Sequence, residues 1–185
     1  MSYEAFDLPR AFPSSVHKSA LELVSLLGRP VPYQSVFSAN VEGEAVVIPD
    51  RIYDDLSSNN SLVGISSLQL ELLHCLMTRH HNGLVREEHL IHVLCLPNPW
   101  IPPFVIQLVG EYVIEILNVI QKNLHKLDAP LYRQFLADNG AFFSTTKQRV
   151  MSYWDCYYRE YRKEDYVGFQ IISFFDRLSL DSESR

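Results

Sequence analysis

The sequence predicts a mainly helical fold with one small β-hairpin near the N-terminus. Apolar residues recur at helical spacing over most of the chain after residue 62. The segments 66–69 and 145–148 have the residue types and spacing of a helix capping box. The segment 31–48 alternates apolar and polar residues, turns at an Asn-Val-Glu-Gly sequence, and ends in a β-branched run, a pattern typical of a hairpin. We expect an irregular multi-helix bundle, with a HEAT-like stack of helical hairpins as the alternative arrangement.

We expect one helical domain over residues 1–185. It comprises an N-terminal helix plus hairpin subregion at 1–61, a helical core at 62–180, and a frayed tail at 181–185. Cap residues and helix-ending Gly or Pro residues set the expected helix boundaries. The expected helices are 16–27, 66–80, 85–96, 103–124, a segment beginning after Asp128 and ending before Asn139, 150–162 and 166–180.

Composition restricts the classes of function. The chain is 47% hydrophobic and 21% charged, which suits a globular protein able to bury a core. Its formal net charge of −6 disfavours nucleic acid as a partner, because phosphate neutralisation dominates such binding. No apolar run follows Met1, and the three cysteines form no CxxC motif. We therefore expect a cytoplasmic protein with reduced thiols that neither enters a membrane nor carries a signal peptide.

The segment 103–124 is the most apolar of the chain and is predicted to be its central helix. Its polar residues are spaced by four, four, three and four, so they share one stripe: Gln107, Glu111, Glu115, Asn118 and Lys122. Two carboxylates near its middle argue against a membrane span. We interpret the stripe as the one solvated edge of the helix. The alternative is that Glu111 and Glu115 form a carboxylate pair for acid–base chemistry.

Five histidines fall within nineteen residues: His74, His80, His81, His89 and His92. His89, His92 and Glu88 can share one helix face and are weak candidates for metal ligands. No HExxH motif is present, and histidine near a helix end is favoured by the helix dipole. We therefore favour a structural role and expect no metal and no cofactor.

The connection between the second and third predicted helices is the first choice for a functional surface. Arg79, His80, His81 and Arg86 crowd this short segment, and their charge opposes that of the whole chain. We expect these side chains to be exposed and to contribute to binding a partner protein. Trp100 is a candidate aromatic anchor for the same contact, although a core tryptophan is an equal alternative.

The segment 147–163 interleaves basic and aromatic residues, as in platforms that stack single-stranded nucleic acid. However, Val150, Trp154, Tyr157 and Tyr161 recur at helical spacing. We therefore expect this stripe to face the core, with polar tips at its edge.

No nucleotide-binding loop, no GxSxG motif and no catalytic cysteine context is present. We expect a non-catalytic protein-interaction module that binds another protein, such as an adaptor, an inhibitor or an immunity-type protein. The alternative is a metal-binding or acid–base helical enzyme that uses the His74–His92 cluster with Glu111 and Glu115. The sequence does not decide whether the chain is an enzyme, but it favours a non-catalytic protein.

Overall fold

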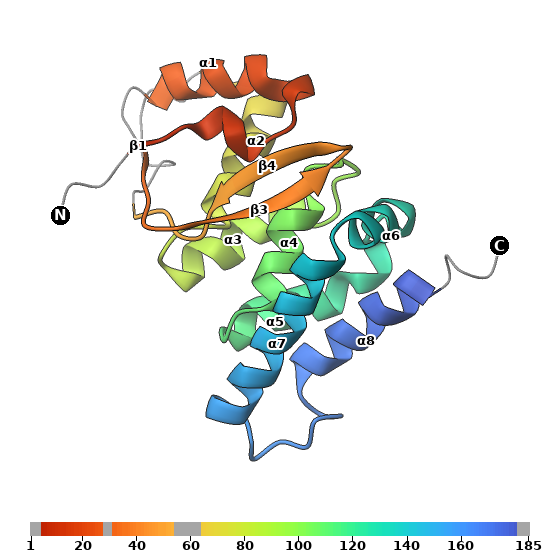
Figure 1. The fold of residues 1–185 in the computed structure, drawn as a ribbon. Coiled ribbons are helices and arrows are strands. Elements are labelled where there is room, and N and C mark those ends of the chain that lie inside the picture. The colour runs from red at the N-terminus through yellow and green to blue at the C-terminus, as the bar shows by residue number, and fades with distance from the viewer. Residues whose placement is uncertain (1–4, 28–30, 54–63, 181–185) are drawn as a thin grey trace. The chain divides into compact units, whose positions relative to one another are not determined.

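The computed structural model describes residues 5–27, 31–53 and 64–180, which contain eight α-helices and two small antiparallel sheets (Figure 1). The predicted mainly helical fold with a small β-hairpin near the N-terminus is therefore confirmed. By its internal contacts the chain divides into two compact units, residues 1–93 and 94–185. The prediction of a single domain and the HEAT-like alternative stay predictions, and the predicted frayed tail 181–185 lies outside the described residues. Within the described ranges, no helix is both long and apolar enough to span a bilayer.

The first unit places a helix and a hairpin ahead of a helical pair. Its elements are β1 (Ala5–Phe6), the 3-10 helices η1 (Leu8–Ala11) and η2 (Ser14–Val16), α1 (His17–Leu27), β2 (Val31–Pro32), β3 (Val36–Val41), β4 (Glu44–Pro49), α2 (Ser67–Met77) and α3 (Gly83–Val93). β3 and β4 pair antiparallel about a turn at Glu42 and Gly43, whose φ angles are 53° and 83°. The Asn40 side chain accepts a hydrogen bond from the Gly43 amide at 2.9 Å, which fixes this tight turn.

The predicted capping box at the start of α2 is confirmed. The Ser66 hydroxyl accepts a hydrogen bond from the Gln69 amide at 3.2 Å, and the Gln69 side chain accepts one from the Ser66 amide at 2.8 Å. These two bonds satisfy backbone donors that have no partner inside the helix. α3 begins at Gly83, two residues earlier than predicted, where the Asn82 side chain accepts a hydrogen bond from the Leu84 amide at 3.0 Å.

The second unit is organised around a short buried helix. Its elements are α4 (Pro102–Val109), α5 (Ile114–Asn123), η5 (Leu124–Lys126), α6 (Ala129–Asp138), α7 (Gly140–Tyr157) and α8 (Val167–Leu180). α4 contacts α5, α6, α7 and α8 (Figure 1). All eight of its residues are buried. Seven of its eight residues are apolar, and a helix of this kind needs neighbours on every side.

The predicted continuous helix over 103–124 is wrong. The helix ends after Val109, and α5 begins only at Ile114. Gly110 lies at the break, and glycine is a poor helix former because it leaves the backbone free. The break also frees the Tyr112 carbonyl, which accepts a hydrogen bond from the Tyr158 hydroxyl at 2.8 Å. In a continuous helix that carbonyl would accept from an amide four residues later.

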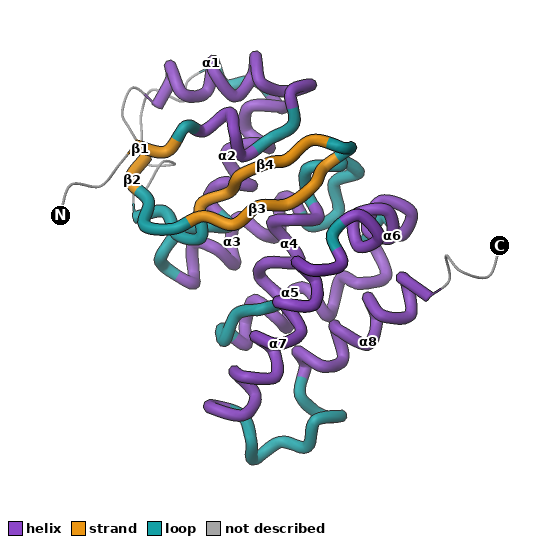
Figure 2. Tube along the Cα trace, in the orientation of Figure 1, coloured by secondary structure: helices purple, strands orange, loops and turns teal. Residues whose placement is uncertain are grey.

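The last three helices follow with one further correction. The predicted cap at Asp128 is confirmed, since its carboxylate accepts a hydrogen bond from the Leu131 amide at 3.1 Å. α7 begins at Gly140, so the capping box predicted at 145–148 is wrong. The Thr145 hydroxyl instead donates to the Ala141 carbonyl inside the helix, at 3.1 Å. Figure 2 shows the connection 158–166, in teal, as a long loop between α7 and α8.

Candidate functional site

The predicted partner-binding segment between α2 and α3 is largely buried. Arg79, His80 and Arg86 are 0%, 4% and 2% exposed, so the expectation that these side chains are exposed is wrong. The Arg79 guanidinium donates to the Asp50 carbonyl at 2.9 Å. The Arg86 guanidinium donates to the His80 and His81 carbonyls at 2.8 and 2.9 Å. Both arginines thus satisfy backbone carbonyls and hold the turn in place.

A strand-like contact with a distant segment explains this burial. The Ile52 amide donates to the Arg79 carbonyl at 2.8 Å, and the Ile52 carbonyl accepts from the His81 amide at 2.8 Å. His81 is exposed and stacks on the exposed Tyr53 ring, with 5.5 Å between the ring centroids. Trp100 is 8% exposed and belongs to the second unit. A role for these residues in binding a partner stays a prediction.

Three of the clustered histidines come together on α2 and α3. Nδ1 of His74 lies 2.7 Å from Nδ1 of His89, and the His74 ring stacks on His92 with 4.3 Å between centroids. Burial, together with His89 and His92, lowers the pKa of His74 to about 4. The weak ligand candidate Glu88 is exposed. No three His, Cys, Asp or Glu side chains among the described residues are arranged to hold a metal ion.

The two glutamates considered for acid–base chemistry have different surroundings. Glu111 is 4% exposed in the break between α4 and α5, whereas Glu115 lies exposed in the first turn of α5. Gln107 is buried as well, at 4% exposed, so the expected solvated edge is wrong for Gln107 and Glu111. The neighbours that enclose α4 bury Gln107, and the break after Val109 separates Glu111 from the helix that carries Glu115.

The second unit carries a cluster of five tyrosines, three of them exposed and two half-buried, which we call the tyrosine surface: Tyr112, Tyr153, Tyr157, Tyr158 and Tyr161. Tyr112, Tyr157 and Tyr161 are 52%, 64% and 49% exposed. The Tyr112 ring lies 5.7 Å from that of Tyr153 and 6.0 Å from that of Tyr157. Tyr158 bonds to the Tyr112 carbonyl and lies 6.4 Å, between ring centroids, from Tyr161. These contacts make the five rings one continuous surface.

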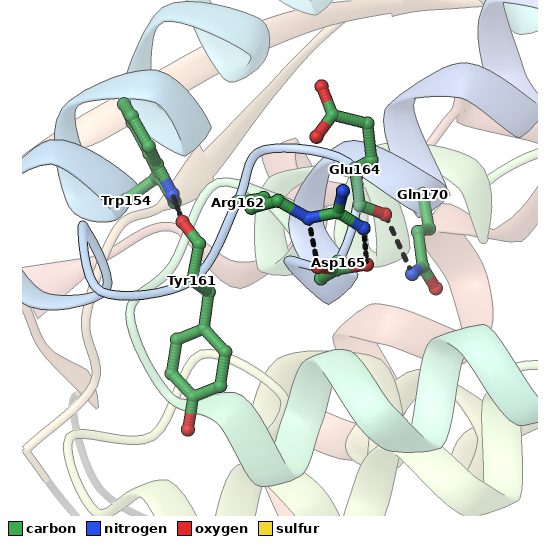
Figure 3. Close-up of polar contacts among 6 residues, drawn as sticks. All are labelled: Trp154, Tyr161, Arg162, Glu164, Asp165 and Gln170. Carbon is green, nitrogen blue, oxygen red and sulfur yellow. Dashed lines mark hydrogen bonds and ion pairs between the residues drawn. The ribbon is translucent and has the colours of Figure 1, made fainter.

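The loop 158–166, which carries part of this surface, is fixed by its own hydrogen bonds. The Trp154 indole donates to the Tyr161 carbonyl at 2.9 Å, and the side-chain amide of Gln170 donates to the Glu164 carbonyl at 3.0 Å (Figure 3). The Tyr161 ring extends away from these bonds (Figure 3). A loop held in this way presents its side chains with little further loss of conformational entropy on binding.

An ion pair within the loop sets its electrostatics. The Arg162 guanidinium contacts both oxygens of Asp165, at 2.9 and 3.3 Å (Figure 3). The hydrogen bond from Arg162 lowers the pKa of Asp165, and that from Asp165 raises the pKa of Arg162. Both groups therefore stay charged at neutral pH and largely cancel one another's field.

A cleft adjoins the tyrosine surface and has a volume of about 300 Å³. Its lining residues come from α5, from the loop and from the start of α8: Ile114, Asn118, Gln121, Tyr161, Asp165, Tyr166, Val167 and Gln170. Tyr161 belongs to both the cleft and the tyrosine surface. Tyr166 is 2% exposed, and burial followed by the nearby Tyr158 raises its pKa to about 12.

Sequence reasoning missed the tyrosine surface because it extended one helical stripe too far. Val150 is buried as expected, but Tyr157 and Tyr161 are exposed, so the expectation of a core-facing stripe is wrong for them. α7 ends at Tyr157, and helical spacing has no meaning beyond that residue. The density of charged residues over 159–165 is the signal that could have marked the end of the helix.

No protein family, no curated protein and no solved structure matches this chain.

Proposed function

We propose that the chain is a non-catalytic protein-interaction module and that the tyrosine surface is its contact face. The exposure of Tyr112, Tyr157 and Tyr161 on one continuous surface carries this proposal. Tyrosine is enriched at protein interfaces, because its ring supplies apolar area while its hydroxyl keeps a polar contact. Three such rings in solvent forgo the favourable free energy of burying apolar surface, and a partner that covers them restores it.

The rigidity of this surface supports the proposal. Tyr158 is bonded to the Tyr112 carbonyl, and Trp154 is bonded to the Tyr161 carbonyl. Ordered aromatic residues in a fixed frame are typical of binding hot spots. Of the residues first considered for binding between α2 and α3, His81 is the one whose side chain is exposed.

The charges near the surface favour a protein over a nucleic acid as the partner. Arg159 pairs with Asp155, and Arg162 pairs with Asp165. These carboxylates neutralise arginines that would otherwise be available to bind phosphate groups. The Tyr112 and Tyr153 ring planes differ by 53°, and those of Tyr112 and Tyr157 by 37°. Tyr112 therefore does not extend the stacked pair of Tyr153 and Tyr157, whose planes differ by 26°, into a longer platform for successive bases.

The test is recovery of a partner from the source cell after crosslinking. We compare the wild type with Tyr112→Ala and Tyr157→Ala, and use Tyr53→Ala as the matched control, because Tyr53 is a 42%-exposed tyrosine of the first unit. Each of the two surface variants is expected to weaken binding about 30-fold, the size of a hot-spot loss, while the control binds like the wild type. Equal retention by all variants would remove the tyrosine surface from the interface. Absence of any stoichiometric partner would refute the module itself.

A further inference from the structure

We infer that the cleft beside the tyrosine surface binds the main chain of an extended, unphosphorylated segment of the partner protein. The inference rests on the proposed protein-binding function and names what part of the partner is recognised. Three observations support it: side-chain amides aligned along one helix face, a carboxylate that remains charged, and the openness of the cleft.

Side-chain amides line one wall of the cleft. Ile114, Asn118 and Gln121 follow each other at spacings of four and three, so they share one face of α5. The side-chain Nε2 of Gln121 donates to the Gln170 side chain, which in turn donates to the Glu164 carbonyl at 3.0 Å. This chain of bonds orients Gln121 and leaves its carbonyl oxygen and one N–H for a ligand. The Asn118 side chain makes no hydrogen bond with any residue that the structure describes.

An amide matches a peptide group in chemistry. Each Asn or Gln side chain offers both a donor and an acceptor, and a peptide group presents the complementary acceptor and donor. The wall from Ile114 to Gln121 comprises eight residues, and the seven steps between them rise about 10 Å at 1.5 Å per residue. An extended chain advances about 3.3 Å per residue, so the wall accommodates roughly three residues.

The described residues that line the cleft include no Lys, Arg or His, so an anionic ligand finds no cation there. Asp165 lines it, and its bond to Arg162 lowers its pKa and keeps it ionised. Arg162 is engaged by both oxygens of that carboxylate, so its guanidinium is not available to a phosphate in the same geometry. A phosphate group therefore gains no charge-assisted bond in this cleft, whereas a main-chain N–H or a basic side chain can donate to the Asp165 carboxylate.

The openness of the cleft favours a polymer over a small molecule. Tyr161, Asp165 and Gln170 are all exposed, yet a small-molecule site normally encloses most of its ligand. A chain that passes through an open cleft gains further contacts outside it, and Tyr161 leads directly to the tyrosine surface. The cleft and the tyrosine surface thus form one continuous site for a peptide.

The experiment uses nuclear magnetic resonance of the full chain and follows the side-chain amide signals of Asn118, Gln121 and Gln170. The probe is a capped tri-alanine peptide, compared with its ester analogue, which lacks main-chain N–H groups, with inorganic phosphate and with maltotriose. We expect saturable shifts from the peptide with a Kd on the order of millimolar, since only a few hydrogen bonds contribute. The ester is expected to bind at least tenfold more weakly, and phosphate and sugar to cause no shift.

Variants complete the test and separate the two proposals. Asn118→Ala/Gln121→Ala is expected to abolish the peptide-induced shifts of Gln170 and to weaken the partner at least tenfold. The control Gln134→Ala, an exposed amide on α6, is expected to change neither. Shifts from phosphate or maltotriose alone, or from no probe at all, would overturn the inference. A partner lost from Tyr157→Ala but kept by the double variant would overturn the cleft while leaving the tyrosine surface in place.

Discussion

Gly168 is the position at which the packing beneath the tyrosine surface can be tested most directly. A Cβ atom added there would lie 2.6 Å from Cε1 of Tyr166 and 2.9 Å from Cγ1 of Val150. Optimal carbon–carbon contacts are about 3.5–4.0 Å. Tyr166 and Val150 are 2% and 1% exposed, so neither side chain has solvent into which it can move. Gly168→Ala therefore forces a rearrangement of buried groups.

The magnitude follows from two opposing effects. Overpacking a core costs about 1–3 kcal/mol, and two violated contacts favour the upper value. Alanine recovers about 1 kcal/mol of helix propensity relative to glycine within α8 (Val167–Leu180). We expect a net loss of about 2 kcal/mol. Helix propensity alone predicts a higher free energy of unfolding for Gly168→Ala. The sign of the measured change in this free energy therefore separates propensity from overpacking.

Urea denaturation followed by tryptophan fluorescence measures this loss. The chain has two tryptophans, Trp100 and Trp154, and both lie in the second unit, so the signal reports on that unit. The control is Gly140→Ala at the start of α7, where an added Cβ meets nothing within 4 Å. The control is expected to be at least as stable as the wild type. A Gly168→Ala variant as stable as this control would refute the close packing of Tyr166 against α8.

Three further outcomes follow from burial and titration. Arg79→Glu is expected to lower the free energy of unfolding by about 3 kcal/mol or more, because it places a carboxylate in a buried site that faces a carbonyl. Arg10→Glu, at an exposed position, is expected to change the free energy of unfolding by no more than about 0.5 kcal/mol. Equal losses in thermal denaturation followed by circular dichroism would contradict this. Glu111→Ala is expected to lower the free energy of unfolding by more than about 1 kcal/mol, and Glu115→Ala by less than about 0.5 kcal/mol. The reverse order in urea denaturation would show that Glu111 is not buried. The nuclear magnetic resonance titration of the His74 ring is expected to have its midpoint near pH 4, and a midpoint near 6.5 would contradict this. Because this pKa lies below the ordinary 6.5, the unfolded state takes up the proton first. Stability is therefore intact above pH 6.5 and falls as the pH drops toward 4.

Local features of the fold were predictable from the sequence. The caps at Ser66 and Asp128 depend on residues three positions apart, and the hairpin turn depends on Asn40 and Gly43. Such signals need no knowledge of the rest of the chain. Gly110 is also a local signal in the sequence, but the long apolar run around it predicted a continuous helix despite this one poor helix former. The structure shows that this residue marks the break.

The candidate site was less predictable because it depends on contacts between distant residues. Arg79 is buried because Ile52, twenty-seven positions earlier, pairs with its backbone. Charge alone predicts an exposed arginine, and no local pattern indicates that pairing. Likewise, Tyr112 and Tyr158 meet across forty-six residues, after a break and a helix end that periodicity does not reveal. Exposure is a property of the folded chain, and residue type predicts it only on average.

The loop 158–166 has a consequence for how this chain can diverge over evolutionary time. Its shape depends on bonds between near neighbours in sequence, such as Trp154 with Tyr161 and Arg162 with Asp165. The exposed Tyr161 ring takes no part in those bonds, because only the Tyr161 carbonyl is used. Selection can therefore exchange this side chain without disturbing the scaffold. A lineage of such chains is expected to keep the tethering residues while the exposed ring at position 161 changes to follow a changing partner.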